Sequence, residues 1–94
     1  ANYVELKVGT RSFVLRDTIS GFHARLDPQR FLRIHRSAIV RIDAIREVEP
    51  LASGRYRVNL HGGQRLVSGR SYRDALRAAL GLAPEASLPS RISA

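Results

Sequence analysis

The sequence has 94 residues and a mass of 10.5 kDa, which is enough for one small domain and too little for two independent cores. It contains no cysteine, which excludes disulfide bonds, a thiol nucleophile and thiolate metal sites. Its net charge of +8 and sequence pI of about 11.4 are typical of a small domain that binds a polyanion, either nucleic acid or an anionic membrane.

The first part of the chain predicts a β-hairpin followed by a short helix. Apolar and polar residues alternate over residues 3–8, and residues 11–16 form a second strand after a turn at Gly9-Thr10. The period then becomes helical in a stripe formed by Ile19, Phe22, His23 and Leu26. Asp17 or Thr18 can cap the start of this helix, and Pro28 ends it because the residue before a proline is pushed out of the α region.

The middle of the chain predicts several short strands. They cover residues 31–34, 38–40, 55–61 and 64–67, and apolar positions also continue through Ile42, Ile45 and Val48. A turn is expected at residues 52–54. Gly62-Gly63 is typical of a tight hairpin turn between the last two strands.

The end of the body predicts one more helix. Ser71 and Asp74 have the spacing of a capping box, and Gly81 is a natural C-terminal residue. Residues 82–94 are rich in proline and serine and show no period, so we expect a C-terminal extension there. The expected fold is mostly β, built of short antiparallel strands with one short internal helix and one C-terminal helix.

Neither catalysis nor metal binding finds support in the sequence. His23, His35 and His61 lie on three different predicted elements without metal-ligand spacing, and His23 is better explained as a partly buried packing residue. Neither a G-x-S-x-G elbow nor a glycine-rich phosphate loop is present. We therefore expect no enzyme, no metal and no cofactor. The absence of a bilayer-length apolar run and of a signal peptide predicts a cytoplasmic domain without membrane contact.

Nine arginines gather in two stretches that contain no acidic residue. Residues 28–42 hold Arg30, Arg33, Arg36 and Arg41, and residues 50–73 hold Arg55, Arg57, Arg65, Arg70 and Arg73. This clustering favours a phosphate-binding surface, although solvated strand faces explain Arg55 and Arg57 equally well. The few aromatic residues lack the paired rings of an RNA-recognition motif. Double-stranded DNA is the leading partner. A basic RNA-binding domain and an interaction module whose charge only aids solubility are the alternatives.

Three blocks of the sequence resemble one known family. They are Asn-Tyr-Val-Glu-Leu at residues 2–6, Leu-Asp-Pro-Gln-Arg-Phe-Leu-Arg-Ile-His-Arg-Ser-Ala-Ile-Val at residues 26–40, and Arg-Ser-Tyr-Arg at residues 70–73. Over residues 1–81 the chain resembles the LytTR domain, the LytR/AlgR-type DNA-binding module of bacterial transcription regulators. The resemblance implies an elongated domain whose loops, rather than a recognition helix, enter the DNA grooves.

The same resemblance implies which residues contact DNA. The expected DNA-binding residues are Asn2, Tyr3, His35, Arg36, Ser37, Arg70 and Arg73. The first two belong to a groove-facing loop, and the next three to a loop along the backbone in which Arg36 and Ser37 contact phosphates. Arg70 is expected at a base edge and Arg73 on a nearby phosphate.

The resemblance also implies partners and shows departures. Family members are usually C-terminal output domains of response regulators and bind repeated half-sites as dimers. We therefore expect a homodimer on DNA and an N-terminal sensory or receiver domain in the full-length protein. The family has one more strand before the first block, which we expect to be missing here. Arg41 stands where the family often has Asn, and Gly69 where it usually has Ser before Arg70.

Overall fold

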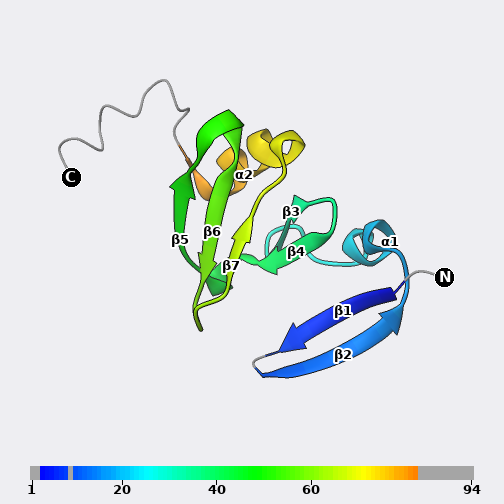
Figure 1. Ribbon diagram of the computed structural model, residues 1–94. Helices are drawn as coiled ribbons and strands as arrows, with labels where there is room; N and C mark the ends of the chain where they lie inside the picture. Colours follow the sequence, from blue (N-terminus) through cyan, green and yellow to red (C-terminus); the bar gives the residue numbers. More distant parts are fainter. Residues whose placement is uncertain (1–2, 9, 83–94) are drawn as a thin grey trace.

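The computed structural model describes residues 3–8 and 10–82. These residues form seven strands, which make three small antiparallel sheets, and two α-helices (Figure 1). The strands are β1 (Tyr3–Val8), β2 (Arg11–Arg16), β3 (Phe31–His35), β4 (Ala38–Arg41), β5 (Ile45–Pro50), β6 (Tyr56–Leu60) and β7 (Arg65–Val67). The helices are α1 (Ile19–Ala24) and α2 (Arg73–Leu80), and three 3₁₀ turns lie at η1 (Ile42–Ala44), η2 (Ala52–Gly54) and η3 (Arg70–Tyr72). The predicted fold class is confirmed.

Each sheet pairs strands that are close in sequence. β1 pairs with β2, β3 pairs with β4, and β5, β6 and β7 form a sheet in that order. The overall dimensions are 46 × 25 × 23 Å, so the domain is elongated, as the resemblance implied. The β6–β7 connection follows the predicted glycine turn, because Gly62 and Gly63 both have positive φ angles, of 98° and 95°.

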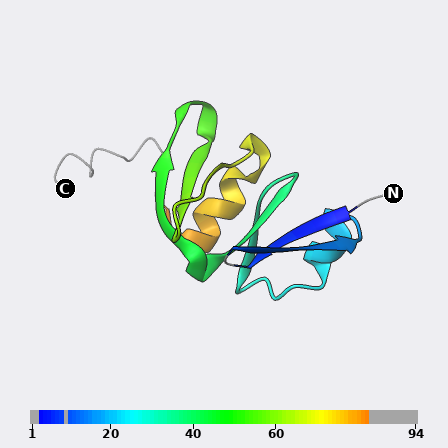
Figure 2. The same ribbon diagram turned by 60° about the horizontal axis from the view of Figure 1, so that its bottom comes forward.

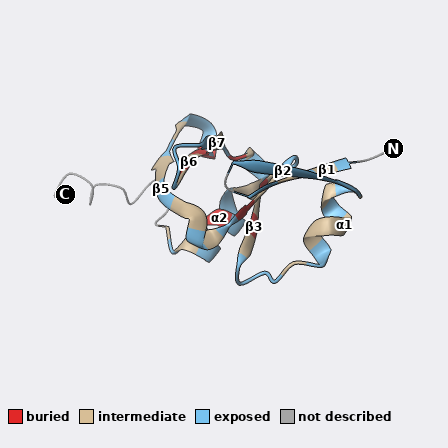
Figure 3. Cartoon of the chain, turned by 90° about the horizontal axis from the view of Figure 1, so that it is seen from below, coloured by how far each residue is buried: buried red, intermediate tan, exposed pale blue. Residues whose placement is uncertain are grey.

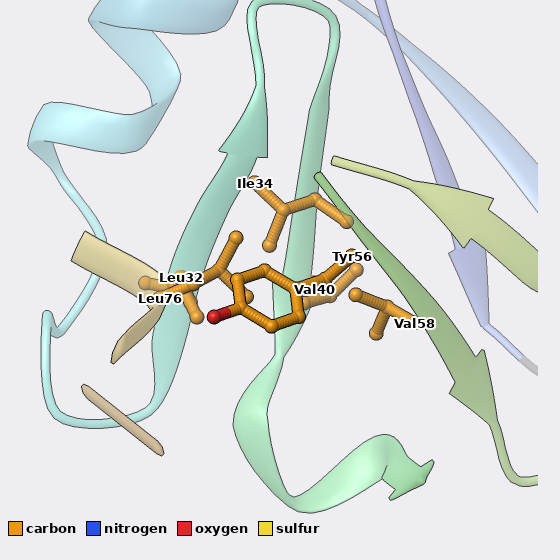
Figure 4. Close-up of a cluster of buried hydrophobic side chains, with 6 residues drawn as sticks. All are labelled: Leu32, Ile34, Val40, Tyr56, Val58 and Leu76. Carbon is orange, nitrogen blue, oxygen red and sulfur yellow. The ribbon is translucent and has the colours of Figure 1, made fainter. Parts of the chain in front are cut away.

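One hydrophobic core joins the second sheet, the third sheet and α2. Its six buried residues are Leu32, Ile34, Val40, Tyr56, Val58 and Leu76 (Figure 4). Helix α2 lies against both sheets in the turned view (Figure 2), and Leu76 enters the core from its buried face. Alternation along β3 and β6 explains this arrangement, since every second side chain of a strand points to the same face.

The β1–β2 hairpin lies outside this core. Strand β2 is exposed along its whole length, whereas the buried residues cluster on β3, β6 and α2 (Figure 3). Five of the six large exposed apolar residues in the described part of the chain belong to the hairpin, namely Tyr3, Val8, Phe13, Val14 and Leu15. A cleft of about 940 Å³ is lined by β1, α1 and β4. The stability of the domain therefore rests mainly on the other two sheets.

Helix α1 begins as predicted but ends earlier than predicted. Thr18 is its N-cap, and its side-chain hydroxyl accepts a 2.9 Å hydrogen bond from the backbone N–H of Gly21. The helix ends at Ala24, several residues before Pro28. After Ala24 the N–H groups of Arg25 and Leu26 donate to the carbonyls three residues earlier, which tightens the last turn and ends the helix, and Asp27 then starts a separate turn.

The predicted capping box of the last helix is wrong. The chain first makes the 3₁₀ turn η3, and α2 then begins at Arg73 without a side-chain cap. The carboxylate of Asp74 accepts from Nε of Arg73 instead of reaching back to the backbone near Ser71. The predicted end at Gly81 is confirmed, with the left-handed backbone of a helix C-terminus.

Candidate nucleic-acid interface

The turn between β3 and β4 presents Arg36 at an exposed apex. His35 ends β3, and its Nδ1 accepts a hydrogen bond from the backbone N–H of Ser37 at 3.1 Å and lies 2.8 Å from Oγ of Ser37. The His35 ring is half-buried, whereas Arg36 and Ser37 are exposed. His35 thus closes the turn and leaves the side chain of Arg36 exposed at its apex.

The segment before α2 is fixed by an extension of the β6–β7 ladder. The backbone N–H of Ser68 donates to the carbonyl of Tyr56 at 2.9 Å, and the N–H of Tyr56 donates to Oγ of Ser68 at 2.9 Å. Ser68 is buried, with an exposed fraction of 1%. Arg70, two residues later, is exposed and starts η3. The backbone that carries Arg70 is therefore anchored to the core.

These two loops touch each other. The N–H of Gly69 donates to the carbonyl of Ile34 at 2.9 Å, which ties the start of η3 to β3. A methyl group at Gly69 would come within 3.2 Å of the Tyr72 ring and 3.5 Å of the His35 ring. The β3–β4 turn and the loop before α2 lie close together in Figure 1. The departure of this chain at Gly69 thus fits a site where two rings leave little room for a side chain.

Arg73 lies in a different environment from Arg70. Its Nε is 3.3 Å from a carboxylate oxygen of Asp74, and its side chain lies across Gly54 of η2. In the described structure Asp74 makes no ion pair with Arg70, so this carboxylate does not hold Arg70 in a structural role. Arg73 can reach a phosphate only by leaving Asp74 or by sharing the contact.

Of the two DNA contacts expected at the start of the chain, Asn2 and Tyr3, one lies in the described part of the structure. Tyr3 lies on β1, is 64% exposed, and lines the same cleft as Arg36 and Ser37. Asn2 lies outside the described residues. The structure therefore places Tyr3 at a cleft that the β3–β4 turn also lines, whereas η3 adjoins that turn but does not line the cleft.

The two arginine stretches contain no acidic residue, but the fold brings carboxylates from other parts of the chain close to four of their arginines. Four of their arginines face carboxylates from outside the stretches, in the pairs Arg30–Asp27 at 3.8 Å, Arg41–Asp43 at 2.9 Å, Arg57–Glu49 at 3.6 Å and Arg73–Asp74 at 3.3 Å. Within residues 3–8 and 10–82, no ion pair forms at Arg36, Arg55, Arg65 or Arg70. Arg36 and Arg70 are thus available to an external anion at the two adjoining loops.

The outer face of the β5–β6–β7 sheet carries mixed charge. The Asn59 side-chain amide donates to Glu47 at 3.2 Å and to Glu49 at 2.9 Å. The hydrogen bond from Asn59 to Glu49, together with the charge of Arg57, lowers the pKa of Glu49 below its ordinary value of 4.5. The acidic side chains offset Arg57 here, so this face is a poorer phosphate-binding surface than the two loops.

The lowered pKa of Glu49 predicts acid sensitivity. A carboxyl group whose pKa is lower in the folded state stabilises the fold above its unfolded pKa, and this contribution is lost as the pH falls through the folded value. The stability difference between the wild type and Glu49→Gln should therefore shrink as the pH falls below 4.5. Chemical denaturation at several pH values measures this difference. A difference that stays constant from about pH 7 to about pH 3 would contradict the prediction.

Ser68→Ala should destabilise the domain. The substitution removes the acceptor of the buried Tyr56 N–H group, and an unpaired buried donor costs about 1–3 kcal/mol. Ser71→Ala, at an exposed position three residues later, is the control and should change the unfolding free energy by about 0.5 kcal/mol or less. Equal effects of the two variants in urea denaturation would show that the Ser68 hydrogen bond contributes nothing.

Ser68 and Arg33 have roles in the structure that their sequence positions did not predict. Ser68 was not singled out from the sequence, and nothing local signals that its hydroxyl pairs with a strand twelve residues away. Arg33 entered only as one of the clustered arginines. Its place on β3 between the buried residues Leu32 and Ile34 is a signal that its side chain points to the opposite face, toward α1 and η3.

Comparison with known proteins identifies relatives of this chain. Residues 1–81 match the model of the LytTr DNA-binding domain family. The chain is 32% identical over 80 residues to the sensory transduction protein LytR of Streptococcus mutans, covering 83% of this chain and 33% of that protein. It is 35% identical over 66 residues to the transcriptional regulatory protein LytR of Staphylococcus aureus, covering 70% of this chain and 27% of that protein. The chain thus spans about a third of the length of these relatives.

A solved structure has the same fold. It is a LytTr DNA-binding domain from Bacillus cereus, with a TM-score of 0.75 and 24% sequence identity over 85% of this chain and 80% of that one. Neither helix of the described residues is long and apolar enough to cross a membrane. In the same residues, no three His, Cys, Asp or Glu side chains gather in a way that could hold a metal ion.

Proposed function

This chain belongs to the LytTR family of DNA-binding domains, and from this premise we propose that it reads a specific sequence of double-stranded DNA through the β3–β4 turn and the η3 loop. The family is defined by DNA binding, so the domain is a binding module and not an enzyme. The proposed mode is insertion of loops into the DNA grooves, with no helix acting as the reading element.

One observation carries this proposal. The structure holds two exposed arginines, Arg36 and Arg70, on adjoining loops that are anchored to the core, and neither forms an ion pair within the described residues. Rigid loops with unpaired arginines lose little conformational freedom on binding, which favours a specific interface. Helix α2 directs its buried face to the core at Leu76, which leaves the loops as the better candidates for contact.

The proposed roles differ between the two loops. Arg70 reads a guanine, because the planar guanidinium can donate to O6 and N7 together in the major groove. Arg36 and Ser37 hold a phosphate and fix the position of the domain on the duplex, while His35 shapes their turn. The remaining proposed contacts are Asn2, Tyr3 and Arg73, with Arg73 exchanging Asp74 for a phosphate.

We further propose the context of the domain. Residues 1–81 form the DNA-binding domain and residues 82–94 an extension. The relatives are named as sensory transduction and transcriptional regulatory proteins about three times as long, which supports a role as the output domain of a cytoplasmic bacterial regulator with a sensory or receiver domain in the remaining length. The domain pairs on repeated half-sites, and sedimentation of the free domain should show a monomer that becomes two copies per duplex on DNA.

Selection from random DNA tests the function. The domain is bound to a pool of random duplexes of about 30 base pairs, which is long enough for two half-sites one helical turn apart, and the retained DNA is sequenced. Enrichment of a common repeated motif is the expected result. Retention without any motif would contradict sequence-specific reading. Stronger competition by structured RNA than by the selected duplex would favour the RNA-binding alternative, and no binding at low salt would leave only an interaction module.

A further inference from the structure

We propose that Arg33 is a positioning residue that sets the relative placement of the two DNA-contacting loops. The inference rests on the proposed function, because it gives Arg33 a task at the same site. It also gives Arg33 a different role from the one its sequence position suggested, which was to bind a phosphate together with the neighbouring arginines.

The guanidinium of Arg33 contacts three separate segments. Its Nε donates to the backbone carbonyl of His35 at 3.3 Å, and one Nη donates to the carbonyl of Arg36 at 2.6 Å. The other Nη donates to Oγ of Ser20 in α1 at 2.8 Å. The same group lies over the ring of Tyr72 in η3, with 5.8 Å from Cζ to the ring centroid. One side chain thus connects α1, the β3–β4 turn and η3.

These contacts use the properties that distinguish arginine from lysine. A guanidinium is planar and presents five N–H groups in a fixed fork, so it can donate to several acceptors at once while its face stacks on an aromatic ring. A lysine carries the same charge but only a single nitrogen at the end of a flexible stem. The arrangement around Arg33 therefore depends on the shape of the side chain and not on its charge alone.

The position of Arg33 is suited to coupling the loops without holding the fold together. The loops already meet at their base, where the N–H of Gly69 donates to the carbonyl of Ile34. The core below them is formed by other residues, among them Leu32 and Leu76. Arg33 is half-buried above this core and donates to two consecutive carbonyls, those of His35 and Arg36, where the chain enters the turn. Loss of its contacts should loosen the loops and leave the sheets intact.

Two variants separate positioning from phosphate binding. Arg33→Lys keeps the charge and loses the fork, and Arg33→Ala loses both. If Arg33 contacts a phosphate directly, lysine should preserve most of the affinity and alanine should reduce the salt dependence by about one ion. If Arg33 positions the loops, both variants should weaken binding to the selected duplex to a similar extent, by about tenfold or more.

The matched control is the same pair of substitutions at Arg30. This residue lies three positions earlier and is exposed, and its side chain makes a single ion pair within the described residues, at 3.8 Å from Asp27. Because lysine keeps the charge at this exposed position, Arg30→Lys should bind the selected duplex as well as the wild type even if Arg30 meets a phosphate. The control thus separates loss of a guanidinium at the positioning site from loss of one elsewhere on the same basic stretch.

A second measurement examines the free protein without DNA. Hydrogen exchange at the N–H groups of Ser37 and Gly69 reports on the two loops, and exchange at Val58 reports on the core. Arg33→Lys should accelerate exchange at Ser37 by about tenfold and leave Val58 unchanged. Unchanged exchange at both loop positions would overturn the inference. The Val58 signal also shows that the variant is folded, and Ser20→Ala, which removes only the contact to α1, gives a milder second variant if it is not.

The outcomes distinguish this inference from the function on which it rests. If Arg36→Ala and Arg70→Ala weaken DNA binding while Arg33→Lys binds like the wild type, the interface is correct and the positioning role is overturned. If Arg36→Ala and Arg70→Ala both bind like the wild type, the proposed interface itself fails, and the positioning role fails with it. Loss of affinity in Arg33→Lys together with faster loop exchange is the result that supports the proposal.

Discussion

Raising the salt concentration from about 50 to about 200 mM should weaken binding of this domain to its selected duplex by about two to three orders of magnitude. The reason is the release of counterions from DNA when arginines neutralise phosphates. The two arginine stretches can together engage about four to six phosphates, which predicts a slope of about −4 to −5 for the logarithm of the binding constant against that of the salt concentration.

The structure sharpens how this slope should be interpreted. Arg36, Arg55, Arg65 and Arg70 are without ion pairs among the described residues, so they can meet phosphates directly, whereas four other arginines of these stretches would first have to give up a carboxylate. Fluorescence anisotropy over a range of KCl concentrations measures the slope. A slope shallower than about −2 would mean that one of the two stretches does not touch DNA.

Arg70→Ala and Arg36→Ala should impair binding in different ways. Removing a base-reading arginine should cost about 1–3 kcal/mol on the selected site and flatten discrimination at one base pair. Removing a phosphate-binding arginine should weaken binding to selected and random duplexes about equally and reduce the salt slope by about one unit. The difference arises because phosphates are the same at every base pair, whereas guanine presents two acceptors that other bases do not.

The two substitutions serve as controls for each other. Both residues are exposed and neither forms an ion pair in the described structure, so thermal unfolding of the two variants should stay close to that of the wild type. If Arg70→Ala lowers affinity for selected and random DNA by the same factor, it does not read a base. If Arg36→Ala selectively removes sequence preference, the assignment of the two roles is reversed.

Most secondary structure was predictable because its signals are local. The β3 and β4 strands were expected at residues 31–34 and 38–40, and each is one residue longer in the structure. Alternation with period two depends only on adjacent residues, and the turn at Gly62-Gly63 depends only on which φ angles glycine can adopt. The capping box failed because Ser71 lies in the 3₁₀ turn η3 and α2 begins only at Arg73, so Asp74 lies inside α2 and its carboxylate accepts from Arg73.

The sequence placed the expected contact residues on loops, but it did not show how those loops are arranged. The family resemblance placed Arg36 and Arg70 on loops, and the structure puts both on exposed loops that touch. The sequence could not show that Arg57 faces Glu49, because that contact depends on the register between β5 and β6. An acid-free stretch of sequence is therefore a weaker sign of a phosphate-binding surface than an arginine that remains unpaired after folding.

The sequence by itself determined that this is a single, cysteine-free, strongly basic domain of short strands, and its motifs determined the family. These properties follow from composition and from neighbours along the chain. Only the tertiary structure decided that Ser68 pairs with Tyr56, that η3 lies against the β3–β4 turn, and that Arg33 connects three segments. Strand register and helix packing set these distances between residues far apart in sequence, and a local pattern does not contain them.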